Sequence, residues 1–205
     1  MYSDFKTIEQ VKTRLGVSII EERLFNISHV ISYDPILDKE IERGRLMGYS
    51  NEKERSERLI HPVLTEIYML HQNRFKIHSG KSLNVDETKG LTGECDFMFS
   101  VSRVSKLIEA PVFTLVEAKN ENLDNGTAQC MAQMMGAKIY NEQQAKPQKV
   151  IYGCSTIGDL WQFIKLEDNT VTIDTDIYYL DNLGKLLAVL QQILNSFFEN
   201  KTKDN

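Results

Sequence analysis

The fold expected for this chain is decided by two neighbouring stretches, Gly93-Glu94-Cys95-Asp96-Phe97-Met98-Phe99-Ser100 and Pro111-Val112-Phe113-Thr114-Leu115-Val116-Glu117-Ala118-Lys119. The second stretch is a run of β-branched, aromatic and aliphatic residues, which is typical of a strand covered on both faces in the interior of a sheet. The run ends abruptly in charged residues, which lose hydration there and need partners. Because side chains alternate along a strand, we expect Glu117 and Lys119 to point to the same face.

Asp96 is expected at the same sheet surface if the two strands pair as neighbours. In its strand the alternation predicts two faces, one with Glu94, Asp96 and Met98, the other apolar and formed by Cys95, Phe97 and Phe99. Carboxylate oxygens are the ligands that Mg²⁺ and Mn²⁺ prefer, and a neighbouring lysine can orient or deprotonate an attacking water. The pattern therefore predicts a Mg²⁺ or Mn²⁺ site. The alternative is a surface salt bridge between Glu117 and Lys119, with Asp96 at a turn.

Asp96 followed by Glu117-Ala118-Lys119 on a hydrophobic strand resembles the PD-(D/E)xK nuclease superfamily. With Ser56-Glu57-Arg58 and Ile60-His61-Pro62-Val63-Leu64 upstream, residues 53–165 resemble the nuclease domain of type I restriction enzyme R subunits and related stand-alone proteins. The proline of the superfamily's name is absent, since Glu94-Cys95 precedes Asp96. The resemblance implies an α/β restriction-endonuclease-like fold, a mixed central sheet flanked by helices on both faces. It also implies three metal ligands, Asp96, Glu117 and the carbonyl of Ala118, with Lys119 positioning the nucleophilic water.

A helix is expected to begin at Asn51 and to pack on the sheet, because apolar residues from Leu59 to Leu70 recur at helical spacing. Pro62 either starts its regular part or kinks it. Glutamates flank the apolar stripe on both sides. The resemblance implies one acidic side chain from this helix in the site; the surrounding sequence favours Glu57, and Glu66 is the rival.

A second helix is expected from Thr127 to about Asn141, after a loop at residues 120–126. Gln129 and Gln133 lie one turn apart on one face of it, and buried amides need hydrogen-bond partners. The resemblance implies a glutamine lining the site here. We take Gln133 as the candidate, and Gln129 remains open.

Composition limits the class of protein. With 41% hydrophobic and 26% charged residues among 205, the chain reads as a globular protein, with a nuclease-like domain at 51–205 and an N-terminal helical extension at 1–50 packed on the core. No apolar run reaches the roughly 20 residues of a membrane helix. Cys95, Cys130 and Cys154 lack metal-type spacing and read as reduced core residues, so we expect a cytoplasmic protein. The net charge of -5 argues against a broad basic DNA-binding surface, which makes a partner subunit or a homodimer an open expectation.

The remaining elements are expected in a simple order. We expect helices at Thr7–Leu15, Ile36–Met47 and Asp181–Phe198, a short strand near Ser82–Val85, a parallel strand at Lys149–Cys154, and a hairpin of Leu160–Leu166 with Thr170–Ile173. Trp161 and Phe163 are expected in the core rather than on a base. The leucine-rich last helix packs either on the body or on another subunit.

The function expected is Mg²⁺-dependent hydrolysis of phosphodiester bonds in nucleic acid, DNA before RNA, of a restriction or repair type. Asp96, Glu117, Lys119, Glu57 and Gln133 are its candidate residues. Two alternatives remain: a nuclease-fold subunit that binds or assembles without cleaving, and an interaction protein that dimerises through its last helix.

Overall fold

A computed structural model describes residues 1–72, 74–119 and 122–203 of the chain. Within these ranges the helical elements are η1 (Tyr2–Asp4), α1 (Ile8–Leu15), α2 (Ile36–Met47), α3 (Glu52–Arg55), the π-helical η2 (Ser56–Ile60), α4 (His61–Leu70), α5 (Leu123–Gln143), η3 (Leu180–Asn182) and α6 (Leu183–Lys203). The strands are β1 (Ser18–Glu22), β2 (Lys76–Ser82), β3 (Glu94–Ser100), β4 (Val112–Ala118), β5 (Val150–Thr156), β6 (Leu160–Glu167) and β7 (Thr170–Tyr179). The chain is therefore an α/β protein.

The strands of the described ranges form one mixed sheet of seven, in the order β1-β7-β6-β5-β4-β3-β2. β3 and β4 are antiparallel neighbours, α5 then leads to β5 parallel to β4, and β6 and β7 form an antiparallel hairpin. The succession from β3 through α5 and β5 to the β6–β7 hairpin is the one that the sequence predicts. Every residue of β4 is buried, as expected for an interior strand, because both of its faces are covered.

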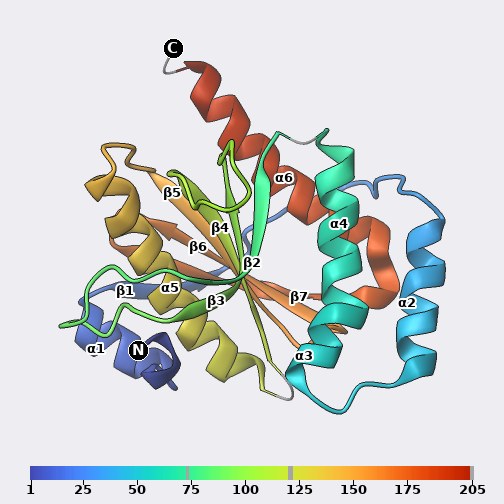
Figure 1. The fold of residues 1–205 in the computed structure, drawn as a ribbon, viewed down its shortest axis with the longest axis horizontal. Coiled ribbons are helices and arrows are strands. Elements are labelled where there is room, and N and C mark those ends of the chain that lie inside the picture. The colour runs from blue at the N-terminus through green and yellow to red at the C-terminus, as the bar shows by residue number, and fades with distance from the viewer. Residues whose placement is uncertain (73, 120–121, 204–205) are drawn as a thin grey trace.

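Helices cover both faces of the sheet, which Figure 1 shows nearly edge-on. On one side α1 and α5 pack over a core that includes Met98, Leu115 and Met131. On the other side α2, α4 and α6 enclose a second core with Phe97, Phe113 and Trp161. Within the described ranges, no helix is both long and apolar enough to cross a membrane.

Several aromatic and leucine residues for which the sequence leaves two placements open lie in the core. Trp161 and Phe163 are fully buried, as expected, and cannot stack on a base. The apolar face of α6 packs on the body of the protein, with Leu187 and Leu190 at 0% and 1% exposure. The leucine-rich face that the helix-mediated alternative would use is therefore covered by the body of the protein.

The N-terminal region is more than a helical extension. α1 and α2 form where expected, and Thr7 accepts a hydrogen bond from the backbone of Gln10 as the N-cap of α1. However, residues 18–22 form the edge strand β1, parallel to β7. The sequence gives little sign of this strand because four of its five side chains are exposed. Tyr2, Phe5 and Val17 also lie in the α5-side core, so residues 1–50 complete the domain.

Other element boundaries also differ from expectation. The strand expected near Ser82–Val85 is instead β2 at Lys76–Ser82, a polar edge strand whose last four residues are exposed. α5 begins at Leu123, inside the segment expected to be a loop, because Asn122 caps it by accepting from the backbone of Asp124 and Asn125. Cys95 packs in the core with Met98 rather than with Phe97, which breaks the alternation expected in β3.

The helix expected from Asn51 is interrupted by a π-helical segment. Asn51 caps α3, and the chain then widens so that the backbone of His61 donates to the carbonyl of Ser56. Pro62 explains the widening, since a proline has no N–H for the carbonyl four residues earlier, that of Arg58, and its ring crowds that oxygen. The Arg58 carbonyl faces Gly44 of α2, where a Cβ would lie 2.4 Å from the oxygen.

Gly44→Ala should therefore destabilise the fold by about 1–2 kcal/mol, because the clash with a backbone atom outweighs the gain of about 1 kcal/mol in helix propensity. Urea unfolding measures the change. Arg43→Ala, at the exposed neighbouring position, is the control and should be near neutral. A Gly44→Ala variant at least as stable as wild type would contradict this packing.

Candidate functional site

The candidate site lies where β3 and β4 stop pairing. Phe97 and Val116 form the last ladder pair of the two strands at this end. Beyond it, the side chain of Asp96 takes the place of a backbone partner, and its Oδ2 accepts a hydrogen bond of 2.7 Å from the Ala118 N–H. This bond fixes the Asp96 carboxyl beside the end of β4, next to Glu117.

Glu117 is a buried carboxyl group with both oxygens engaged. Its side chain is 1% exposed. Lys119 Nζ donates to Oε1 at 2.5 Å, and Gln133 Nε2 of α5 donates to Oε2 at 2.6 Å. The expected same-face placement of Glu117 and Lys119 is thus observed. The alternative of a surface salt bridge is wrong, because one partner is in the interior.

Burial controls the protonation of both carboxyl groups. Loss of hydration, together with the nearby charge of Asp96, raises the pKa of Glu117 to about 8. Burial likewise raises the pKa of Asp96 to about 6, against the lowering effect of the Ala118 N–H bond. Near neutral pH the pair therefore does not hold two full negative charges without additional positive charge.

Lys119 stays a cation in this setting. Burial alone lowers the pKa of Lys119, but Glu117 and Glu52 oppose this and leave the pKa above its ordinary value. Glu52 Oε2 of α3 lies 3.6 Å from Lys119 Nζ. Glu52 is not among the site residues expected from the sequence. The signal available for it was the Asn51 cap, which places Glu52 in the first turn of the helix expected to flank the site.

A pocket of about 410 Å³ opens beside Asp96. Its walls come from the start of the site helix and from the strand ends, and include Glu52, Glu57, Glu94, Asp96 and Ala118. Glu57 therefore faces the same hollow as Asp96. Glu66 does not line this pocket; its Oε1 accepts a hydrogen bond of 2.9 Å from the Asp34 N–H, which makes it a structural residue.

The two glutamines of α5 also separate. Gln133 is fully buried and donates a hydrogen bond to Glu117, whereas Gln129 is half-buried. Neither glutamine is among the residues that line the pocket. The Oε1 atom of Gln133 is buried without a hydrogen-bond partner in the described structure. The structure therefore brings Gln133, rather than Gln129, to Glu117.

The donor set fits a hard divalent cation. Asp96 and Glu117 provide carboxylate oxygens, and the raised pKa of each is what a cation between them would reverse. No group of three or more His, Cys, Asp or Glu side chains within the described residues is arranged to hold a metal. Mg²⁺ commonly keeps several waters and binds through one or two carboxylates, so two are sufficient for it.

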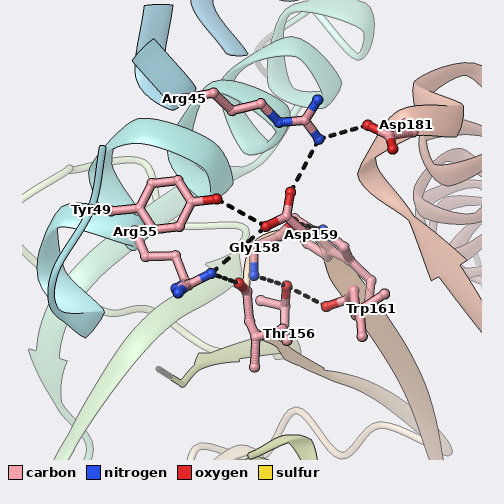
Figure 2. A network of polar contacts seen from close by, with 10 residues as sticks. Arg45, Tyr49, Arg55, Thr156, Gly158, Asp159, Trp161 and Asp181 are labelled. Carbon is pink, nitrogen blue, oxygen red and sulfur yellow. Dashed lines mark hydrogen bonds and ion pairs between the residues drawn. The ribbon is translucent and has the colours of Figure 1, made fainter. Parts of the chain in front are cut away.

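A polar network anchors the helical wall of the pocket (Figure 2). The carboxylate of Asp159, in the turn between β5 and β6, accepts from Arg45 at 3.1 Å and from Tyr49 at 3.1 Å. Arg55 of α3 lies 3.7 Å from the same carboxylate and stacks 4.3 Å over the Tyr49 ring. Arg45 also bonds Asp181 at 2.6 Å.

The same turn holds the end of β4. Arg55 donates to the carbonyl of Ile157 at 2.9 Å, and the N–H of Lys119 donates to the carbonyl of Thr156 at 2.8 Å. Inside the turn, Thr156 Oγ1 accepts from the Gly158 N–H at 2.9 Å, as Figure 2 shows. Both walls of the pocket are thus hydrogen-bonded to the same β5–β6 connection.

Comparisons with known proteins add no family assignment. No protein-family model matches this chain, and no curated protein sequence matches it.

Replacing Glu117 by Gln should flatten the pH dependence of stability. Between the ordinary carboxyl pKa and the value of about 8, the folded chain retains a proton that the unfolded chain releases, so raising the pH favours unfolding. Between about pH 5 and pH 8.5, without metal, wild type should lose about 2–4 kcal/mol more of its unfolding free energy than Glu117→Gln does. Urea titrations with a chelator measure this, and Glu40→Gln, at an exposed site, should follow wild type. Equal slopes in Glu117→Gln and wild type would contradict the burial effect.

Asp159→Ala should loosen the helical wall, because it removes the shared acceptor of Arg45, Tyr49 and Arg55. We expect a loss of about 1–3 kcal/mol and faster hydrogen exchange at residues 52–60. Asp176→Ala is the control, since Asp176 pairs with a single arginine, Arg23, whose side chain is 66% exposed, and this pair should contribute less than about 1 kcal/mol. Unchanged exchange in Asp159→Ala would show that the network does not hold the wall.

Proposed function

We propose that this chain is a metal-dependent nuclease of the PD-(D/E)xK type with a restriction-endonuclease-like fold. The observation that carries the proposal is the convergence of Asp96, Glu117 and Lys119 at the end of an interior strand, beside a pocket into which Glu57 also faces. A buried, electrostatically coupled pair of carboxyl groups beside a pocket is a feature of functional sites, since structural pairs rarely need an adjacent pocket.

The arrangement of elements supports the finer fold assignment. The resemblance implies a helix before the sheet, two antiparallel strands bearing the acidic residues and the lysine, and a crossover helix bearing a glutamine. The chain has η2–α4, β3 with β4, and α5 in those places, with Gln133 on α5.

Asp96, Glu117 and the carbonyl of Ala118 would hold Mg²⁺ or Mn²⁺. Such an ion supplies a nucleophilic water at neutral pH and offsets negative charge on the phosphate. Lys119, protonated in this setting, would donate hydrogen bonds to the water or to a phosphate oxygen rather than accept a proton. Gln133 would hold Glu117 in place, and Glu52 and Glu57 would bound the pocket.

The setting is part of the proposal. DNA is the substrate that the resemblance implies. The net charge of -5 favours recognition by a partner subunit, a homodimer or a local groove over a broad basic surface. The three free, buried cysteines suit a reducing compartment such as the cytoplasm.

Lys119→Ala should abolish cleavage of labelled DNA and RNA while Mn²⁺ binding is retained, because the lysine acts on the reacting water and phosphate but is not a ligand. Cleavage is measured on gels, and Mn²⁺ binding by calorimetric titration. Lys53→Ala is the matched control: Lys53 also lines the pocket but is given no role in the reaction, so its rate should change little.

The same titration on Asp96→Ala separates the alternatives. Binding in wild type that is lost in Asp96→Ala supports the metal site. Retained cleavage by Lys119→Ala would overturn the mechanism. Metal binding without cleavage of any substrate would instead favour the nuclease-fold subunit that binds without cutting.

A further inference from the structure

The pocket at the carboxylates continues into a second hollow of about 320 Å³. The two share His61, Ser79 and Phe97 in their walls. The second hollow runs between α4 and β2, away from the end of β4. Together they form one groove, which we call the α4–β2 groove, with the carboxylates at one end.

Charge changes along this groove. The lining of the first hollow includes four acidic side chains and one lysine, namely Glu52, Glu57, Glu94, Asp96 and Lys53. Among the described residues, the side chains that line the second hollow include no carboxylate, and Lys76 is the basic one. A divalent cation would suit the first part, whereas the second suits a group that is uncharged or weakly negative.

The second hollow is lined by apolar side chains together with hydrogen-bonding groups. Tyr68 and Ile77 are half-buried, and Leu64 lies beneath them. Lys76 Nζ lies 3.4 Å from the Tyr68 hydroxyl and 5.9 Å from the centre of its ring. Aromatic rings, a neighbouring cation and hydroxyl groups such as those of Thr65 and Ser105 are the contacts that hold nucleobases without reading their sequence.

We propose that the α4–β2 groove binds an unpaired nucleotide, with its base in the Lys76–Tyr68 hollow and its phosphate directed to the carboxylate end. The substrate class is then single-stranded or locally unpaired nucleic acid. A base inside a duplex is covered on both faces by its neighbours, so it enters such a hollow only after leaving the stack. This inference rests on the proposed function and makes its substrate more specific.

The size of the hollow agrees with this occupant. A volume of about 320 Å³ lies at the lower end of the roughly 300–1,000 Å³ found for small-molecule sites, so it accepts one nucleotide and not a length of duplex. Contact with a base face, rather than with many phosphates, also suits an acidic protein.

The test is fluorescence anisotropy with short labelled oligonucleotides, DNA and RNA of one sequence, each single-stranded, fully paired, or paired with a central mismatch bubble. The measurements are made in Ca²⁺. Thr65→Trp fills the hollow from an exposed position on α4 and should weaken single-strand binding about tenfold, with Mn²⁺ binding unchanged. Lys76→Gln should weaken it less. Met69→Trp, exposed on the same helix but outside the hollow, is the matched control and should bind as wild type does.

Single-stranded and bubble substrates should bind more tightly than the paired duplex, and the DNA and RNA arms show which sugar is accepted. Tighter binding of fully paired duplex, or unchanged binding by both Thr65→Trp and Lys76→Gln, would overturn the inference. Failure of the proposed function would give a different result. The protein would then neither bind Mn²⁺ nor cleave, but it would still bind single strands, and Thr65→Trp would still weaken that binding. The groove would in that case be a binding site without catalysis.

Discussion

The burial of the Glu117 carboxyl group is the constraint on which the site depends. A carboxylate at 1% exposure is stable only if a proton, a cation or hydrogen bonds replace its lost water. Lys119 and Gln133 each serve one oxygen, which requires α5 to start close to the end of β4. Gly126 makes that approach possible, since a Cβ there would lie 2.9 Å from Lys119 Cγ and 2.2 Å from Ser155 Oγ.

The position of the helical wall of the pocket depends on a different feature, the π-helical segment η2. The missing N–H of Pro62 widens the helix into a π segment, and Gly44 leaves room for the displaced Arg58 carbonyl. This sets the position of Glu57, which belongs to that segment. The β5–β6 turn then connects the two walls. The carbonyl of Thr156 accepts a hydrogen bond from the Lys119 N–H, and the carboxylate of Asp159 contacts Tyr49 and Arg55 on the helical side. The end of β4 and the helical wall of the pocket are thus held by contacts with the same turn.

The sequence predicts the parts of this arrangement that depend on local patterns. The apolar run that ends at Glu117 predicts β4, and the helical spacing of apolar residues from Leu59 predicts the buried face of α4. Thr7 and Gly16 mark the two ends of α1. The sequence does not predict features set by distant contacts. β1 and β2 are edge strands in which four residues each are exposed, so neither shows an alternating pattern.

The same limit applies to the site. Helical spacing alone does not distinguish Glu57 from Glu66, or Gln133 from Gln129. The Asp34 N–H donates to Glu66, and Gln133 donates to Glu117, only once the chain is folded. Glu52 is missed because its partner, Lys119, is far away in sequence. Near neutral pH the buried pair favours a bound proton, and the acidic pocket repels phosphate. Under the proposed function a single divalent cation replaces the proton and reverses that repulsion, so metal affinity, stability and substrate approach are linked through the same two carboxyl groups.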